Sequence, residues 1–346
     1  RDAEVDFLKK YRLSNIELNF DFNKDNLKFQ EIKLLLNNKN FVFNKLIIEK
    51  KDKEFFVSGK VNNKKILFND KEINKIFDQN VLDIIKIYFK SENQFSFFIN
   101  KKFRIKKFEI TSNIFIEQAL LNNKYELKNF FPEISSFFSL KDQKIKIIYK
   151  NDILKIAGNG FINLNDKKDK IEYNITKKSK KINFNSSIVI SENKLDLDFL
   201  NFRKRDNTDL IIKIRGFKNL DESLILNEIS LLEDYNKIKV SDLFLTKDLK
   251  IKKFKSIELD FIDKQDLKNQ ISIYQKNKEY FLKGNFYNAD KLIEKSISSD
   301  DKNNKELFDS DFKLNINIEE VYLDKENITN NLQGKIEFKN NNINEA

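Results

Sequence analysis

Apolar and polar residues alternate along much of the chain. In residues 16–22, for example, every second residue is apolar and the residues between them are polar or charged. Successive side chains of a strand point to opposite faces, so this pattern predicts a strand with one dry and one hydrated face. The apolar positions of the clearest segments are Ile16, Leu18, Phe20, Phe22; Ile145, Ile147, Tyr149; Ile171, Tyr173, Ile175; Leu195, Leu197, Phe199; Leu210, Ile212, Ile214; Ile257, Leu259, Phe261; and Phe312, Leu314, Ile316, Ile318.

Short runs rich in Asn, Asp and Lys separate these segments, as at residues 62–65 and 150–152. Asn and Asp tolerate the left-handed backbone conformation of tight hairpins, so we expect successive strands to pair as hairpins. The predicted fold is therefore mostly β: an elongated, curled antiparallel sheet of repetitive meander strands, with a few short amphipathic helices.

All six glycines lie in contexts that resemble strands, with apolar residues nearby on both sides. Glycine inside a strand marks a bulge, a bend or a close approach of backbones. The expected strand-bend glycines are Gly59, Gly158, Gly160, Gly216, Gly284 and Gly334.

Helical spacing of apolar residues replaces the alternation in two places. Residues 70–90 predict an amphipathic helix, and residues 288–297 predict a shorter one. The only proline, Pro132, suggests a further short helix and a boundary between sub-domains. We therefore expect an N-terminal β segment over residues 1–130 and a second β segment over residues 131–346.

The formal charge of +11 arises from 65 basic and 54 acidic residues, which are interleaved along the chain. Basic residues also mix with aromatic ones over residues 101–108, a composition found in proteins that bind single-stranded nucleic acid. Alternation, however, places Phe103 and Ile105 on the dry face and the lysines on the wet face, so ring and charge would not act together. We expect no nucleic-acid partner.

No enzyme site is evident in the sequence. The absence of His and Cys excludes the usual general base, thiolate metal sites and the common nucleophile systems within these residues. The glycines form no phosphate-binding loop. Asp196 and Asp198 are close in sequence, but both are expected to face solvent on a strand, where a glycosidase pair does not form. We expect neither a cofactor nor a metal.

A one-sided apolar face is compatible with two structures. A closed core would cover it with a second layer, and the chain would then be a structural β-domain that binds protein partners. An open groove would leave it available to acyl chains. No apolar run reaches the length of a membrane span, and a chain that begins at Arg1 without any Met is expected to be a fragment with its anchor elsewhere.

The second half of the chain resembles the AsmA-like proteins of the bacterial envelope, which include the YhdP and TamB types. The resemblance spans about residues 144–340 and rests on the runs 155–162, 280–284 and 288–293, although Asn288 stands where the family pattern has Asp. It implies a periplasmic protein anchored in the inner membrane of a Gram-negative-type cell, with no catalytic residues.

The same resemblance implies a β-groove that carries phospholipid or maintains outer-membrane lipid, with other envelope proteins as further partners. The candidates for lipid-facing residues are Ile171, Tyr173, Ile175, Leu195, Leu197, Phe199, Leu210, Ile212, Ile214, Ile257, Leu259 and Phe261.

Overall fold

The computed structural model describes residues 13–76, 83–123, 127–164, 167–219, 223–277, 279–297, 308–309, 311–339 and 342–345. It is mostly β, with long antiparallel strands and two short α-helices, as the alternation predicts. The chain forms two compact units: Arg1–Tyr125, Ser135–Asp166 and Glu172–Ser179 make up unit 1, and Glu126–Ile134, Lys167–Ile171 and Lys180–Ala346 make up unit 2. This division differs from a single cut at residue 130, because residues 135–166 pair with strands of the first unit.

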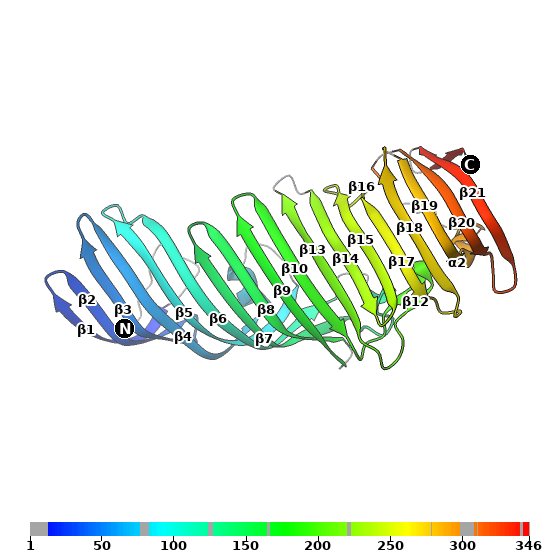
Figure 1. The fold of residues 1–346 in the computed structure, drawn as a ribbon. Coiled ribbons are helices and arrows are strands. Elements are labelled where there is room, and N and C mark those ends of the chain that lie inside the picture. The colour runs from blue at the N-terminus through cyan, green and yellow to red at the C-terminus, as the bar shows by residue number, and fades with distance from the viewer. Residues whose placement is uncertain are drawn as a thin grey trace. The chain divides into compact units, whose positions relative to one another are not determined.

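Unit 1 is a meander of antiparallel strands that pair in chain order (Figure 1). Its elements are β1 (Leu13–Asn23), β2 (Asn26–Leu36), β3 (Lys39–Lys51), β4 (Glu54–Asn69), α1 (Asp70–Ile76), β5 (Ile84–Asn100), β6 (Ile105–Asn122), β7 (Phe137–Lys150), β8 (Ile153–Leu164) and most of β9 (Lys167–Lys178).

Most strands of unit 2 are also antiparallel, but β10 pairs with β13, β11 and β12 form a separate two-stranded sheet, and β15 pairs with both β16 and β17. In addition, β19 and β20 pair in parallel, and the helix α2 lies between them in the chain. A parallel pair needs such a crossover, whereas an antiparallel pair needs only a tight turn. The elements are η2 (Leu127–Asn129), β10 (Lys181–Ile190), β11 (Asp196–Leu197), η3 (Asp198–Leu200), β12 (Phe202–Arg203), β13 (Leu210–Asn219), β14 (Leu224–Glu233), β15 (Asn236–Leu245), β16 (Ile251–Lys253), β17 (Ser256–Ile262), β18 (Lys268–Lys276), β19 (Glu279–Asn288), α2 (Asp290–Ile297), β20 (Phe312–Tyr322), β21 (Ile328–Lys339) and β22 (Asn342–Glu345).

Asn and Asp residues form the tight turns. Asn151 and Asp152 both have positive φ at the β7–β8 hairpin, as do Asn37 and Asn38 at the β2–β3 hairpin. Two successive residues with positive φ give the hairpin turn whose twist matches that of the strands. The expected turn at residues 62–65 is wrong, because these residues lie inside β4, where the register shifts between Asn63 and Ile66.

The helix predicted over residues 70–90 is correct only at its start. At α1, the Asn69 side chain accepts the Glu72 N–H at 3.0 Å and the Glu72 carboxylate accepts the Asn69 N–H at 3.0 Å. This reciprocal capping box explains why the helix begins at Asp70. Residues 84–90 belong to strand β5, and residues 77–82 lie outside the described ranges.

The second predicted helix is confirmed as α2, which follows β19. The Asn288 side chain accepts the Asp290 N–H at 3.1 Å, and Ala289 packs with Ile293, Ile318 and Val321. The short helix expected after Pro132 is wrong, because Pro132 lies in a turn and β7 begins at Phe137.

Candidate functional site: an apolar face with an aromatic ladder

The apolar residues of unit 1 lie in register across its strands. Cross-strand neighbours follow one another from Phe20 to Phe29, Leu46, Gly59, Phe95, Ile110, Tyr149 and Leu154. A parallel row joins Phe22 to Leu27, Ile48, Val57 and Phe97. Residues that are directly paired share one face, so unit 1 has a continuous apolar face that extends over its strands.

Five aromatic rings form a connected series on this face, which we call the aromatic ladder. The centroids of Phe43 and Phe95 are 6.4 Å apart, those of Phe95 and Phe97 are 5.9 Å apart, and those of Phe97 and Phe108 are 6.2 Å apart. Tyr149 completes the ladder at 6.0 Å from Phe108. These spacings suit offset or edge-to-face aromatic contacts.

The ladder is open to solvent in part. Phe108 is 38% exposed, and Phe20 and Phe22 on β1 are 60% and 73% exposed. All the described strands of unit 1 belong to one sheet, and α1 is the one α-helix found among them. An exposed apolar series of this extent is unusual for a surface without a ligand or a partner.

Glycine makes room for large side chains on the same face. The Phe95 ring lies over Gly59, and the Tyr173 ring lies over Gly158, where an added Cβ would stand 2.3 Å from the ring. The burial of Tyr173 raises the pKa of its phenol above the usual value of 10.0. The absence of a side chain at Gly158 therefore lets the Tyr173 ring pack directly against the backbone of β8.

A small polar cluster lies between β4 and β5. Ser91 donates a short hydrogen bond to Asn63, and the Asn93 amide donates to Ser91 Oγ at 2.8 Å and to the Val61 carbonyl at 3.1 Å. On β7, the Gln143 amide donates to the Phe161 carbonyl at 2.9 Å, while its buried Oε1 has no protein partner. Asn63, Ser91 and Gln143 are buried, so these polar groups belong to the interior of the sheet and are not exposed on the apolar face.

Charged side chains, in contrast, line a depression in unit 1. It has a volume of about 730 Å³ over β4 to β9, and its lining includes Lys90, Glu92, Lys144, Lys146 and Glu172. These residues occupy the positions between the apolar ones, and their side chains are exposed. The depression is therefore not a cavity of the aromatic ladder.

Unit 2 also has a row of apolar residues in register, which runs from Leu231 through Ile238 and Leu259 to Ile271. Here, however, a second layer covers the face. Residues 191–205, which we call the crossing segment, pack Leu195, Leu197 and Phe202 against Phe261 and its neighbours. Phe202 and Phe261 meet edge to face at 5.5 Å and are each 1% exposed. This end of unit 2 is a closed core.

Buried polar groups hold the crossing segment in place. The Asp169 carboxylate accepts the backbone N–H of Ser191 at 2.9 Å and the Asn193 amide at 2.6 Å. The buried Glu233 accepts the Arg205 N–H at 2.7 Å and the Thr208 hydroxyl at 2.6 Å. These hydrogen bonds fix both ends of the crossing segment over the sheet. They also satisfy the buried carboxylates of Asp169 and Glu233.

The alternation at residues 195–199 does not form the expected strand. Only Asp196–Leu197 pairs as β11, and a 3₁₀ turn follows at Asp198–Leu200. Leu195 and Leu197 are buried, whereas Phe199 is 58% exposed, so the three residues do not share a face.

Of the two carboxylates expected to face solvent, Asp198 does so with 63% of its side chain exposed, whereas Asp196 is only 13% exposed. Lys264 Nζ lies 2.5 Å from Asp196 and 3.3 Å from Asp198. Burial raises the pKa of Asp196, but hydrogen bonds and charge from Lys264 and Arg203 outweigh it, and the pKa lies below 3.8.

The lipid-facing candidates therefore fall into separate groups. Leu195, Leu197, Leu210, Leu259 and Phe261 lie in the closed core, and Ile212 and Ile257 pack against it. Ile171, Tyr173 and Ile175 on β9 and Ile214 on β13 are partly buried. Phe199 points away from the core.

The sequence pattern alone does not reveal the aromatic ladder, although the alternation in residues 95–99 indicates a strand with Phe95 and Phe97 on one side.

All six expected strand-bend glycines lie within strands. The register shifts beside Gly216 and opposite Gly284, and Gly160 packs against Gln143. Gly334 has no atom within 4 Å of an added Cβ.

Phe103 and Ile105 contradict the expectation of a dry face. Phe103 is 88% exposed in the turn between β5 and β6, and Ile105 is 60% exposed as the first residue of β6. The reason is that the alternation there belongs to a hairpin tip and not to the body of a strand.

None of the described helices has the length and apolar character needed to cross a bilayer. Within the same residues, no three His, Cys, Asp or Glu side chains gather as they would around a metal ion. Comparison of the chain with protein-family models, curated proteins and solved structures finds no match.

Proposed function

We propose that the apolar face of unit 1 binds the acyl chains of lipids along the aromatic ladder. The observation that carries the proposal is the continuity of the ladder: contacts of 5.9 to 6.4 Å join its five rings while Phe108 remains partly exposed. An acyl chain that covers such a row gains about 0.8 kcal/mol for each methylene removed from water.

The resemblance to AsmA-like proteins extends this proposal to a cellular role. The chain would be a non-catalytic segment of a periplasmic protein anchored in the inner membrane, and its cargo would be phospholipid moving to or from the outer membrane. The one-sided strands support lipid contact, whereas the compartment, the anchor and contacts with other envelope proteins rest on the resemblance.

The crossing segment favours a different role for unit 2. Leu197, Phe202 and Phe261 are buried together, so these side chains are not accessible to acyl chains. We propose that unit 2 combines this closed core with its own apolar rows as a structural β-domain, and that acyl chains contact unit 1.

The test uses two Phe residues on opposite faces of the same strand. Phe108 belongs to the ladder, and Phe115 lies on the other face of β6, where Lys90 Nζ is 5.2 Å from its ring centroid. The variants Phe108→Asp and Phe115→Asp are compared with the parent chain for binding of a phosphatidylethanolamine that carries a fluorescent acyl chain. Their melting temperatures are measured in parallel.

We expect Phe108→Asp to weaken binding about tenfold or more, because a carboxylate in the row opposes contact with an apolar chain. Phe115→Asp should leave binding within about twofold of the parent, since that ring faces away from the ladder. Equal effects of the two variants, or no binding by the parent chain, would exclude the proposal.

A further inference from the structure

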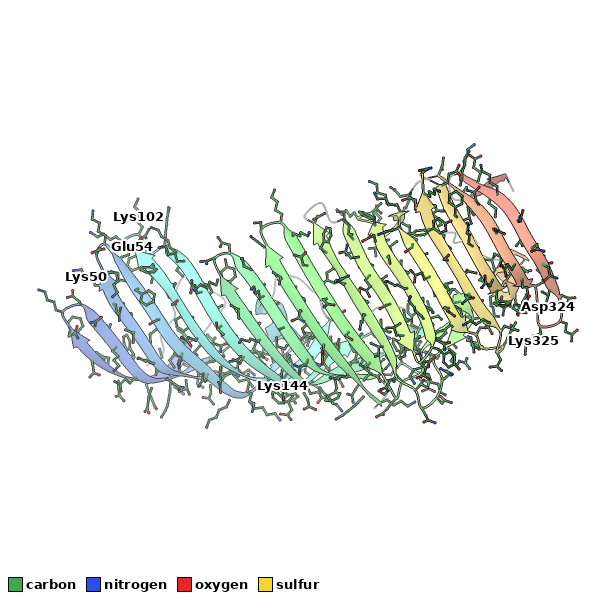
Figure 2. The ribbon with its side chains drawn as sticks, in the orientation of Figure 1. Lys50, Glu54, Lys102, Lys144, Asp324 and Lys325 are labelled. Atoms are coloured by element: carbon green, nitrogen blue, oxygen red, sulfur yellow. The ribbon has the colours of Figure 1, made fainter. Side chains whose placement is uncertain are left out.

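The hairpin tip between β5 and β6 exposes apolar and basic side chains together. All residues from Lys101 to Phe108 are exposed, and Phe103 is the most exposed large apolar side chain among the described residues. Figure 2 shows Lys102 at the upper ends of the unit 1 strands, near Lys50 and Glu54 of the adjacent β3–β4 hairpin. Phe108 belongs to the aromatic ladder, whereas residues 101–107, which form the tip, make none of the ladder's ring contacts and play no part in the acyl-binding proposal.

The backbone holds the tip in a defined conformation. The Asn100 side chain accepts the N–H groups of Lys102 and Arg104 at 2.9 and 3.0 Å, and the Asn100 carbonyl accepts the Phe103 N–H at 2.9 Å. Phe103 has a φ of 56°, at the position of a three-residue hairpin loop that Gly or Asn usually occupies. A bulky residue in this conformation is strained by about 1 kcal/mol, and such outliers cluster at functional sites.

The charge of the tip is strongly positive. Residues 101–107 contain Lys101, Lys102, Arg104, Lys106 and Lys107 and no acidic residue. Lys106 pairs with Glu54 at 2.7 Å, and Lys107 Nζ is 5.4 Å from the Phe98 ring centroid. Lys101, Lys102 and Arg104 are exposed and form no ion pair with the described part of the chain. Three cations therefore surround the exposed ring.

We propose that the β5–β6 tip docks on the surface of a membrane that contains anionic lipids. Phe103 and Ile105 enter the interfacial region, where aromatic rings are favoured, and the three cations contact lipid phosphates. A single-stranded nucleic acid fits less well, because it needs a groove in which several rings stack successive bases beneath a line of charge. Phe103 is the only aromatic residue among residues 100–107, and none of these residues lines the depression over β4 to β9.

The experiment measures co-sedimentation of the whole chain with vesicles of phosphatidylcholine alone, or of equal parts of phosphatidylcholine and phosphatidylglycerol. The decisive variant is Phe103→Asn, because Asn suits positive φ and should leave the fold as stable as the parent or more so. The matched control is Phe199→Asn, which removes an exposed ring from unit 2.

We expect the parent to bind the anionic vesicles and not the neutral ones. Phe103→Asn should weaken binding about tenfold, as the loss of one partly buried ring predicts, and Phe199→Asn should have no effect. Replacement of Lys101, Lys102 and Arg104 with Gln should weaken binding about a hundredfold, at roughly fivefold for each charge near the surface.

Equal binding to both kinds of vesicle, or unchanged binding by Phe103→Asn, would overturn the proposal. A single-stranded oligonucleotide is measured with the same variants. If it binds the parent more tightly than the anionic vesicles do, and loses binding with the triple Gln variant, the tip is a nucleic-acid site and the membrane proposal is wrong. Acyl-chain binding by Phe108→Asp is a separate readout, so either proposal can fail alone.

Discussion

The Phe95 ring on β5 lies over Gly59, its direct cross-strand neighbour on β4. A Cβ at residue 59 would stand 2.8 Å from Cζ of Phe95 and 3.0 Å from the Lys45 carbonyl oxygen. No side chain fits there unless the ring moves, so the position of Phe95 in the aromatic ladder depends on this glycine.

We therefore expect Gly59→Ala to destabilise the chain by about 1 to 3 kcal/mol, the usual cost of extra volume at a packed position. Gly334→Ala is the matched control, because it has free space around the added Cβ, and Gly334 does not have positive φ. There the gain in strand propensity and the loss of unfolded-chain entropy should leave stability unchanged or raise it by up to about 1 kcal/mol. Urea unfolding of both variants measures the difference, and equal effects would contradict the packing described for Phe95.

Alternation predicts the fold well where a strand has one apolar face and one polar face. The strands containing Ile212 and Leu259 are examples, since each has cross-strand partners of the same kind. Residues 84–90 were assigned to a helix because this part of β5 is apolar on both faces: Ile87 and Phe89 pack in one cluster, while Lys65 covers Tyr88 on the other side. Apolar residues on both faces of a strand produce spacings that resemble those of a helix.

The remaining errors depend on contacts between distant residues. Leu195 and Leu197 alternate with Asp residues as a strand would, but their burial results from packing against β13, β15, β17 and β18, which the local pattern does not show. Phe103 was assigned to a strand because its turn has Phe where Gly or Asn marks such a loop. The same limit applies to the candidate site, since rings on β3, β5, β6 and β7 form the ladder only through the register of the sheet.

Leu197 distinguishes a closed core from an open face. It is 8% exposed within the cluster of Phe202 and Phe261. Leu197→Asp would bury a carboxylate in an apolar cluster, so we expect the free energy of unfolding to fall by at least about 3 kcal/mol and the melting temperature to be markedly lower. Phe199→Asp, two residues later and largely exposed, should change stability by less than about 0.5 kcal/mol.

Thermal melting followed by circular dichroism measures both changes. If Leu197→Asp melted like the parent while Phe199→Asp did not, the crossing segment would have the opposite orientation, with Phe199 toward the sheet.

Asp196 should make the stability of unit 2 depend on pH in the acid range. Its carboxylate is 2.5 Å from Lys264 Nζ and 2.8 Å from a terminal nitrogen of Arg203. Burial opposes ionisation, but these hydrogen bonds and charges outweigh burial and hold its pKa below 3.8. A carboxyl group whose pKa is lower in the folded state binds protons more readily in the unfolded chain. The stabilisation that Asp196 gives to the folded state is therefore complete above pH 3.8, and it is lost as the pH falls through the pKa of the folded state.

The prediction compares Asp196→Asn with Asp198→Asn. At neutral pH, Asp196→Asn should lower stability by about 1 to 3 kcal/mol, because two cations lose a charged partner that is mostly buried. Asp198→Asn should cost less than about 1 kcal/mol, since that side chain is 63% exposed and lies 3.3 Å from Lys264. The melting temperatures of the parent and of Asp196→Asn should converge as the pH falls below 3.8, because the parent carboxyl then becomes protonated as well. A difference that stayed constant across this acid range would mean that Asp196 stabilises the crossing segment through its shape and not through its charge.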